Sequence, residues 1–237
     1  MTLVEKIELY SLTLLKGAGF TIGITVITFC VAVALGLLFG AIKAFNAKRE
    51  LSSLLSFTDA VLYLSGRLLV LLINVYVEVF RGLPALAVLF ILYFGLAYAG
   101  LQLGSFAAAV LGLGLIGGAM LTEVFRAGFG SIHQGQREAA LAVGMTPLDA
   151  LRHIILPQTW RITLPPLANY AIGLLKDTAI VSAIAAPEIM FFARNLVTRT
   201  FDTEIIYLLV AVIYFCLSFP LARLADRFEA RARAGVR

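Results

Sequence analysis

Residues Gly135–Pro157 read GQREAALAVGMTPLDALRHIILP and contain two short helical patterns separated by a break. Gly144 suits the left-handed backbone conformation that commonly follows the end of a helix. Thr146 can cap the second helix, Pro147 suits its first turn, and Asp149 stands at the third helical position of a capping box. The stretch therefore predicts two short helices joined at a glycine.

The apolar residues of the second helix are spaced to share one face. Leu148, Leu151 and Ile155 follow at i, i+3 and i+7. Pro157 lacks the N–H group that a continuing helix needs, so we expect the helix to end there. The residues alone leave two interpretations open. The unit could seat in a groove of another protein, with Glu138 available to a basic partner, or it could lie as an amphipathic helix on the inner membrane surface.

The chain around this stretch is too apolar for a soluble protein. It has 237 residues, of which 61% are hydrophobic and 14% are charged, whereas soluble domains carry about 45–50% apolar and about 25% charged residues. So few charges cannot cover the surface of a water-soluble protein of this size, which excludes an ordinary cytosolic enzyme. A membrane-embedded chain fits both numbers.

Apolar runs that are long enough, or nearly so, to cross about 30 Å of hydrocarbon as helices predict the spans. The predicted fold is an all-α integral membrane protein, a single transmembrane domain over residues 1–237 with five transmembrane helices. Residues 135–157 then form a cytoplasmic two-helix loop between the third and fourth helices. The five runs are Leu12–Ile42, Leu83–Leu103, Phe106–Phe125, Leu164–Ala186 and Ile205–Leu224.

A sixth run, Leu54–Phe80, is interpreted as an interfacial helix that precedes the second transmembrane helix. It contains Asp59, Arg67, Asn74 and Glu78, which is a heavy polar load for a helix that faces lipid. An amphipathic helix at the membrane surface accommodates these side chains better.

The positions of the basic residues predict the orientation. With five spans and the N-terminus outside, residues 42–82, residues 126–161 and the C-terminal tail face the cytoplasm. They hold five, four and five Lys and Arg residues, fourteen of the 19 in the chain, as the positive-inside rule requires. A further crossing at Leu54–Phe80 would place two of these basic segments on opposite sides. The net charge of +5 is thus explained by topology, and we expect no nucleic-acid partner.

Two pairs of glycines have the four-residue spacing of close helix contacts. Gly36 with Gly40 and Gly114 with Gly118 are both small-xxx-small pairs. The pattern fits packing between helices of one subunit, and it also fits a face for a second subunit. Packing inside one subunit is the more ordinary interpretation, and the spacing leaves both open.

The sequence contains no catalytic or metal-binding constellation. Cys30 and Cys216 lie in apolar runs without metal-ligand spacing, and His133 and His153 lack a neighbouring cysteine or carboxylate cluster. No GxxxxGK[ST] phosphate-binding loop occurs, so the chain does not hold ATP by that route. We expect no reaction on this chain, no metal site and no cofactor of its own.

Polar residues inside the predicted fourth span are candidates for a pathway through the membrane. Lys176 and Asp177 are adjacent, so they do not share a helix face and should have different partners. They could offer one positive and one negative wall to a zwitterion, or each could pair with a neighbouring helix instead. The candidates are Asn169, Lys176, Asp177, Thr178 and Ser182.

Two further pairs of opposite charge lie near the inner ends of predicted spans. Glu78 with Arg81 and Glu123 with Arg126 are spaced at i, i+3, where side chains of a helix are neighbours. We interpret both pairs as structural or as lining a gate.

The segment Gly135–Pro157 resembles the coupling-loop signature of membrane permease subunits of bacterial ABC importers. Flanking stretches resemble the polar amino-acid branch of that family, which includes histidine, glutamine, arginine and glutamate permeases. They read YVEVFRGLP at 76–84, EVFRAG at 123–128 and LLKDT at 174–178, and the similarity runs from about Gly17 to Leu221. Leu83 and Ala179 depart from the Thr and Ser that are common in the family. The signature residues are Glu138, Ala139, Ala140, Gly144, Ile155, Leu156 and Pro157.

The resemblance implies a type I importer fold and a bacterial inner-membrane permease for a polar amino acid or a close analogue such as an opine. It implies that the signature residues dock on a cytoplasmic ATPase subunit, which holds the ATP and magnesium. The expected partners are a second permease subunit, identical or homologous, two cytoplasmic ATP-binding subunits, an external substrate-binding protein and the lipid bilayer. The expected orientation has the N-terminus outside and the C-terminus in the cytoplasm.

Two other classes of protein fit the sequence less well. An ion-coupled secondary carrier usually shows inverted repeats and broken helices in both halves. A non-transporting membrane scaffold would not explain why Lys176 and Asp177 stand within a span. An associated ATPase subunit would distinguish the importer from both.

Overall fold

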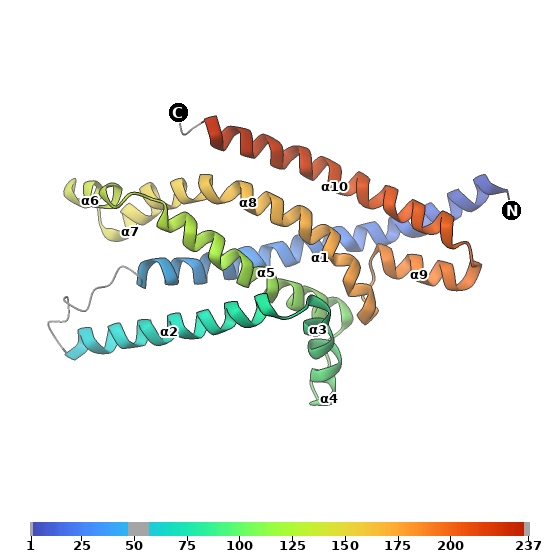
Figure 1. Ribbon diagram of the computed structural model, residues 1–237, viewed down its shortest axis with the longest axis horizontal. Coiled ribbons are helices and arrows are strands. Elements are labelled where there is room, and N and C mark those ends of the chain that lie inside the picture. The colour runs from blue at the N-terminus through green and yellow to red at the C-terminus, as the bar shows by residue number, and fades with distance from the viewer. Residues whose placement is uncertain (1, 47–56, 235–237) are drawn as a thin grey trace. The chain divides into compact units, whose positions relative to one another are not determined.

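The computed structural model describes residues 2–46 and 57–234, and within these ranges it contains helices and no strand (Figure 1). The predicted all-α fold is therefore confirmed for this part of the chain. The helices are α1 Leu3–Asn46, α2 Phe57–Gly82, α3 Ala85–Phe90, α4 Leu96–Tyr98, α5 Ser105–Gly130, α6 Gln134–Ala142, α7 Pro147–Ala150, α8 Leu156–Asp177, α9 Ile189–Thr200 and α10 Thr203–Ala234. π-Helical turns occupy Ile91–Gly95 and Leu151–Ile155, and a 3₁₀ segment occupies Thr178–Ile184.

Five helices among the described residues are long enough and apolar enough to cross a membrane, which confirms the predicted number. They are α1, α2, α5, the continuous helical stretch Pro147–Ile184 and α10. α1 has 44 residues and is about 66 Å long at 1.5 Å per residue, so it extends well beyond the hydrocarbon core.

The identity of the second of these helices differs from the prediction. Leu83–Leu103 was expected to span, yet its apolar helix runs only from Ala85 to Tyr98, about 21 Å and too short for the hydrocarbon core. Pro84 starts this helix in an extended conformation, and Gly100 follows it with a φ of 89°. These two residues cut the apolar run into a short helix with a turn on each side.

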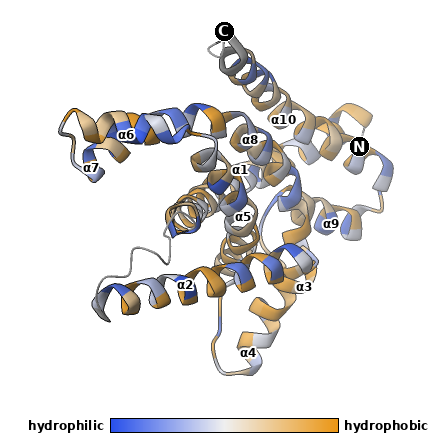
Figure 2. Ribbon diagram, turned by 60° about the vertical axis from the view of Figure 1, so that its left-hand side comes forward, coloured by the Kyte–Doolittle hydropathy of each residue, from blue (hydrophilic) through white to orange (hydrophobic). Residues whose placement is uncertain are grey.

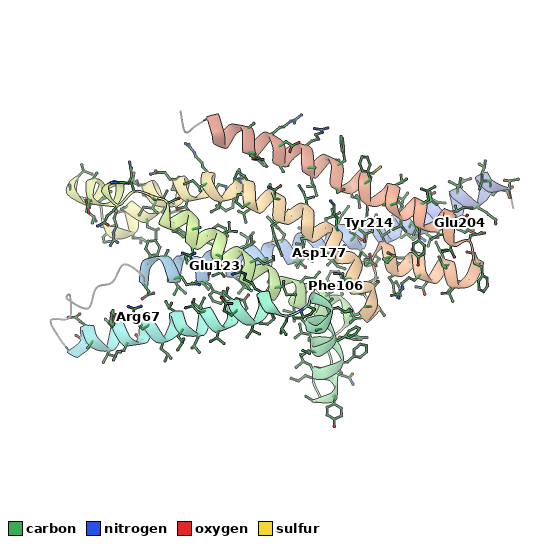
Figure 3. The ribbon with its side chains drawn as sticks, in the orientation of Figure 1. Arg67, Phe106, Glu123, Asp177, Glu204 and Tyr214 are labelled. Atoms are coloured by element: carbon green, nitrogen blue, oxygen red, sulfur yellow. The ribbon has the colours of Figure 1, made fainter. Side chains whose placement is uncertain are left out.

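α2 replaces that run as the second helix of spanning length, although it was expected to be interfacial. Its 26 residues correspond to about 39 Å; residues 54–56 of the predicted interfacial helix lie outside the described residues. Asp59 lies in its first turn, while Arg67 donates to the Tyr63 hydroxyl at 3.1 Å and stacks over the Tyr63 ring (Figure 3). One of the polar side chains that argued against a span, Arg67, therefore has its partner within the same helix.

The chain divides into two compact units, each assembled from separate stretches of sequence. The first unit comprises Met1–Val31, Leu83–Gly114 and Ala168–Phe228. The second comprises Ala32–Gly82, Leu115–Leu167 and Glu229–Arg237.

The first unit contains two apolar clusters. One joins α1, α3, α5 and the end of α8 with its 3₁₀ segment, and its fully buried members include Ile24, Leu89 and Val181. The other joins the N-terminal part of α1 to α9 and the start of α10, through residues such as Leu14 and Ile206. Because α1 contributes to both clusters, one helix organises this unit.

An ion pair closes the second cluster at the start of α10. Lys6 Nζ lies 2.9 Å from an Asp202 carboxylate oxygen, and the Tyr10 hydroxyl donates to the same carboxylate at 2.6 Å. These donors lower the pKa of Asp202 below its usual range, with the Tyr10 hydrogen bond the largest cause. The N-terminal part of α1 is thereby held to the turn between α9 and α10.

The second unit is built on a close approach of α1 to α5 at the predicted glycines. A Cβ atom placed on Gly36 would lie 2.5 Å from Leu121 Cβ, and one on Gly40 would lie 2.7 Å from Phe125 Cβ. Gly118 likewise leaves room for the Tyr76 hydroxyl, 2.7 Å from its Cβ position. In the first unit, a Cβ on Gly114 would meet Val31 Cγ1 at 2.9 Å. All four glycines therefore serve packing inside this chain, as the more ordinary interpretation predicted.

Candidate functional site

The two-helix loop of the second unit forms around Gly144 as predicted. Gly144 has a left-handed φ of 85°. Its N–H donates to the Leu141 carbonyl at 3.0 Å, and the Met145 N–H donates to the Ala140 carbonyl at 3.1 Å. These two bonds form a Schellman motif, which satisfies the last carbonyls of α6 and favours glycine at the left-handed position. The prediction that Gly144 ends the first helix is confirmed.

The cap of the second helix also forms, with one change in its bonding. Thr146 Oγ1 accepts the Asp149 N–H at 3.1 Å, and Pro147 lies in the first turn of α7. The Thr146 hydroxyl donates to the Asp149 carboxylate at 2.6 Å. In a capping box the carboxylate would instead accept the Thr146 N–H, so a bond between side chains replaces half of the predicted box.

The second helix does not end at Pro157, and that prediction was wrong. α7 continues through the π-helical turn Leu151–Ile155 into α8, where the Leu156 N–H donates to the Leu151 carbonyl five residues back. A single π-helical turn shifts the hydrogen-bond register without ending the helix. The missing Pro157 donor is therefore tolerated next to this turn rather than terminating the element.

The loop exposes apolar side chains beside one carboxylate. Leu141, Val143 and Leu148 are 40%, 78% and 71% exposed, and the neighbouring Glu138 and Ala139 are also exposed. We call these five residues the loop surface. Along α6 a mostly hydrophilic first half, Gln134–Glu138, is followed by the apolar residues Ala139–Ala142 (Figure 2). An exposed apolar group of this kind, next to a charge, is typical of a surface that another protein covers.

The predicted signature residues divide between this surface and the interior of the loop. Ala140 and Ile155 are only 5% and 7% exposed, so they pack inside, while Leu156 is partly buried and Pro157 is exposed. Leu148 was expected to share a face with Ile155, but it points outward instead.

Val143 was not singled out from the sequence, and Leu148 was expected on the shared apolar face, yet both are among the most exposed apolar residues. The signal that could have found them is their position on either side of Gly144, because a left-handed turn directs flanking side chains away from the packed face.

The two histidines of the loop have local structural roles. The His133 ring Nδ1 accepts the Gly135 N–H at 3.1 Å and caps α6, and His153 Nδ1 lies 3.1 Å from the Asp149 carbonyl oxygen. Among the residues that the structure describes, no group of three or more His, Cys, Asp or Glu side chains could hold a metal ion.

The candidate pathway residues of the first unit extend from the second half of α8 into the 3₁₀ segment, and Asp177 is the last residue of α8 (Figure 3). Asn169, Lys176 and Asp177 are exposed. The hydroxyls of Thr178 and Ser182 bond to carbonyls of their own helical stretch at 2.7 Å and 2.8 Å. Within the described ranges neither Lys176 nor Asp177 forms an ion pair. Both charges are therefore presented on the outside of this subunit rather than paired within it.

One of the two predicted charge pairs forms, and it is part of a larger group in the second unit. Arg126 Nε lies 2.7 Å from Glu123 Oε2. Lys43, near the end of α1, donates to the other oxygen of the same carboxylate, and its side chain is only 12% exposed. The sequence analysis missed Lys43, whose separation from Glu123 is 80 residues. The group joins the ends of α1 and α5.

The other pair, Glu78 with Arg81, does not form an ion pair among the described residues. Both side chains are exposed near the end of α2. α2, and not Leu83–Leu103, has spanning length. The pair therefore lies at the opposite end of this span from Asp59. The interpretation of this pair as structural or as lining a gate stays a prediction.

Comparison with known proteins identifies the family. A family model described as "Binding-protein-dependent transport system inner membrane component" matches residues 36–234. The chain belongs to this family. It is 34% identical over 203 residues to the probable amino-acid ABC transporter permease protein YckA of Bacillus subtilis (strain 168), a match that covers 86% of this chain and 81% of that protein. It is 30% identical to the glutamine transport system permease protein GlnP of Escherichia coli (strain K12), over 93% of both chains.

Solved structures agree with the family at the level of the fold. A chain from the crystal structure of an amino acid ABC transporter with histidines superposes with a TM-score of 0.79 at 29% identity, covering 98% of this chain and 99% of that one. A chain of the inward-facing MetNI methionine ABC transporter superposes with a TM-score of 0.71 at 19% identity, covering 99% of each.

This family member is therefore the permease subunit of an amino-acid ABC importer, a multi-pass protein of the inner membrane. The predicted family and the type I importer fold are confirmed. Membership also selects the importer over the secondary carrier and the scaffold.

Proposed function

We propose that this permease carries a polar amino acid, or a close analogue such as an opine, in a complex driven by a separate ATPase. The complex contains two permease subunits, two cytoplasmic ATP-binding subunits that hold ATP and magnesium, and an external binding protein that delivers the substrate. The N-terminus lies outside and the C-terminus in the cytoplasm.

The observation that supports coupling is the loop surface. Its apolar residues Leu141, Val143 and Leu148 have no cover within the described chain, and the Schellman turn at Gly144 fixes the two helices that carry them. A rigid, exposed, apolar projection can seat in a cleft of a partner and transmit a displacement. ATP binding would close the ATPase pair, move the two docked loops and shift the spans toward the outward-open state.

The two exposed and opposite charges of Lys176 and Asp177 support a zwitterionic substrate. Both side chains are exposed at the end of α8, and neither is neutralised by an ion pair in the part of the chain that the structure describes. Charged groups inside a span are costly unless they meet a cavity or a partner of opposite charge. Lys176 would meet the carboxylate of an amino acid and Asp177 its ammonium group.

The coupling role is tested by Glu138→Lys and Gly144→Pro in the complete complex reconstituted in vesicles. We expect normal insertion, loss of the ATPase subunit on purification, and uptake per ATP hydrolysed reduced by about tenfold or more, since a docked charge and a rigid turn are both lost. Glu204→Lys is the matched control, because Glu204 is an exposed residue of α10 in the first unit and is not part of the loop (Figure 3). Unchanged co-purification and unchanged coupling in both loop variants would refute the proposed role.

The substrate role is tested by Lys176→Met and Asp177→Asn in the same vesicles. Competition of radiolabelled glutamine uptake by a panel of amino acids identifies the substrate class. We expect the KM of the preferred amino acid to rise about tenfold or more in each variant, since each removes one charged hydrogen bond. Lys16→Met, at an exposed lysine of α1, is the control. An unchanged KM in both variants would exclude these residues from the substrate site.

A further inference from the structure

Glu188 is the one fully buried carboxylate among the described residues, and it lies outside the predicted pathway. It is 0% exposed and follows the 3₁₀ segment that Lys176 and Asp177 precede. Within the described ranges it forms no ion pair. Burial raises the pKa of the Glu188 carboxyl above its ordinary range, while its hydrogen bonds act in the opposite direction. Burying a carboxylate is costly, so we expect Glu188 to have a specific role at this position.

Neutral donors from two elements serve this carboxylate. Glu188 Oε2 accepts the Met190 N–H at 2.8 Å, and Oε1 accepts the Phe191 N–H at 2.6 Å. The Tyr214 hydroxyl, from the middle of α10, donates to Oε2 at 2.8 Å. Glu188 therefore caps the N-terminus of α9, where a negative charge is favoured, and at the same time holds α9 to α10.

The same network reaches α1 and the start of the 3₁₀ segment. The Ile189 N–H donates to the buried Thr21 hydroxyl of α1 at 3.2 Å. The side chains of Thr21 and Thr178 also interact with the Tyr214 hydroxyl. Side chains thus accept the N–H groups of the first three residues of α9, Ile189 to Phe191. The polar cluster joins four elements of the first unit: α1, the 3₁₀ segment, α9 and α10.

The packing around the cluster leaves little freedom for these elements to shift. A Cβ atom on Gly17 would lie 2.9 Å from Ile189 Cα, so α1 and α9 are in close contact. Thr178, Val181 and Ile184 of the 3₁₀ segment are 0–1% exposed. Ala185 ends the segment with a φ of 55°, a conformation that non-glycine residues adopt only when their surroundings enforce it.

We propose that Glu188 and Tyr214 are positioning residues for transport. Their polar cluster fixes the switch from α-helix to 3₁₀ helix after Asp177, and this switch sets the orientation of the Lys176 and Asp177 side chains. Thr178, the residue directly after Asp177, connects the cluster to that switch: its side chain is fully buried close to the Tyr214 hydroxyl, and its own hydroxyl donates to the Leu175 carbonyl at 2.7 Å. Neither positioning residue touches the substrate. This inference rests on the proposed role of Lys176 and Asp177.

The test uses Glu188→Gln and Tyr214→Phe, which keep side-chain volume and remove one donor or acceptor each. A glutamine side chain has one acceptor oxygen where the carboxylate has two for its three donors, and phenylalanine cannot donate a hydrogen bond to Glu188. Glu204→Gln and Tyr207→Phe are matched controls on α10, both at exposed positions.

The first measurement is the labelling rate of Asp177→Cys by a charged thiol reagent, in a chain whose exposed Cys30 and Cys216 are replaced by serine. We expect each positioning variant to change this rate about threefold or more, since a lost hydrogen bond of ordinary net strength corresponds to a factor of that size or larger. The controls should keep the starting rate. Equal rates in Glu188→Gln, Tyr214→Phe and the controls would overturn the proposal.

The second measurement is glutamine uptake by the complete complex in vesicles, with native Asp177. The positioning variants should raise KM about tenfold while the maximal rate changes by less than about twofold, whereas a general loss of folding would lower the maximal rate and leave KM unchanged. If Glu188→Gln does not fold, Tyr214→Phe decides the outcome. Failure of the wild-type complex to show ATP-dependent uptake would refute the proposed function, and the labelling result would still decide the positioning role.

Discussion

The phenol of Tyr214 donates a 2.8 Å hydrogen bond to the Glu188 carboxylate across 26 residues of sequence. The carboxylate has two further donors from the first turn of α9. Since the acid is fully buried and has no cation in an ion pair among the described residues, its protonation state affects the stability of the first unit.

Replacing Glu188 by glutamine should change how stability depends on pH. Burial raises the folded-state pKa of Glu188, so its contribution to stability is complete below the unfolded-state pKa of about 4.3 and is lost as pH rises through the folded-state pKa. Relative to Glu188→Gln, the wild-type protein should lose stability as pH rises above the unfolded-state pKa and through the raised folded-state pKa. Thermal unfolding in detergent measures this difference. Glu204→Gln should parallel the wild type, and a difference that is constant or grows with pH would contradict the prediction.

Removing the Glu123 carboxylate should destabilise the second unit more than removing Arg126. Glu123→Gln leaves the mostly buried Lys43 ammonium without its partner, which we expect to cost about 1–3 kcal/mol, the lower part of the range for a buried pair because Glu123 is partly exposed. Arg126→Gln should cost less than about 1 kcal/mol, since its side chain is 47% exposed. Denaturant unfolding of both variants tests the order.

A double variant separates the ion pair from other effects of these substitutions. Lys43→Met combined with Glu123→Gln removes both charges and should recover part of the stability lost in Glu123→Gln alone, because no unpaired charge stays buried. Strictly additive losses would show that the two side chains do not interact energetically.

Substituting Gly144 should disturb the loop through its backbone and not through crowding. A Cβ atom at Gly144 would meet nothing within 4 Å, but its φ of 85° disfavours alanine by about 1–2 kcal/mol. Gly144→Ala should therefore reduce uptake per ATP hydrolysed, and Gly144→Asn should reduce it less, since asparagine tolerates the left-handed region better. Gly130→Ala, also without a Cβ contact, is the control. Equal coupling in all three variants would show that the turn is not needed.

The sequence predicted best those features that depend on neighbouring residues. The glycine stop, the Thr146 cap and the Glu123–Arg126 pair all follow from spacings of three or four residues, which backbone geometry determines directly. Lys43 with Glu123, at a separation of 80 residues, and Ile189 with Thr21, at 168, could not be predicted because only the tertiary packing brings them together. The charge on Glu188 gave no signal, since it resembles any exposed loop glutamate until its burial is known.

Two of the wrong predictions have a common physical origin. The missing N–H group of Pro157 predicted a helix end, and hydropathy predicted a span at Leu83–Leu103. Neither rule takes account of the local backbone geometry that competes with it. A π-helical turn absorbs the missing donor at Pro157. At Leu83–Leu103, hydropathy favoured a span, yet Pro84 and Gly100 limit the helix to Ala85–Tyr98.

The corrected second span predicts that the two ends of α2 lie on opposite sides of the membrane. Gly82→Cys places a thiol at the end of α2 where a Cβ atom meets nothing within 4 Å, and Asp59→Cys places one in its first turn. In intact cells carrying the Cys30→Ser and Cys216→Ser background, a membrane-impermeant reagent should label Gly82→Cys, whereas Asp59→Cys should react only after permeabilisation. Gln102→Cys, on the exposed turn before α5, serves as the external control, since both topologies place it outside. Labelling of Gly82→Cys and Asp59→Cys from the same side would restore the interfacial helix and make Leu83–Leu103 the span.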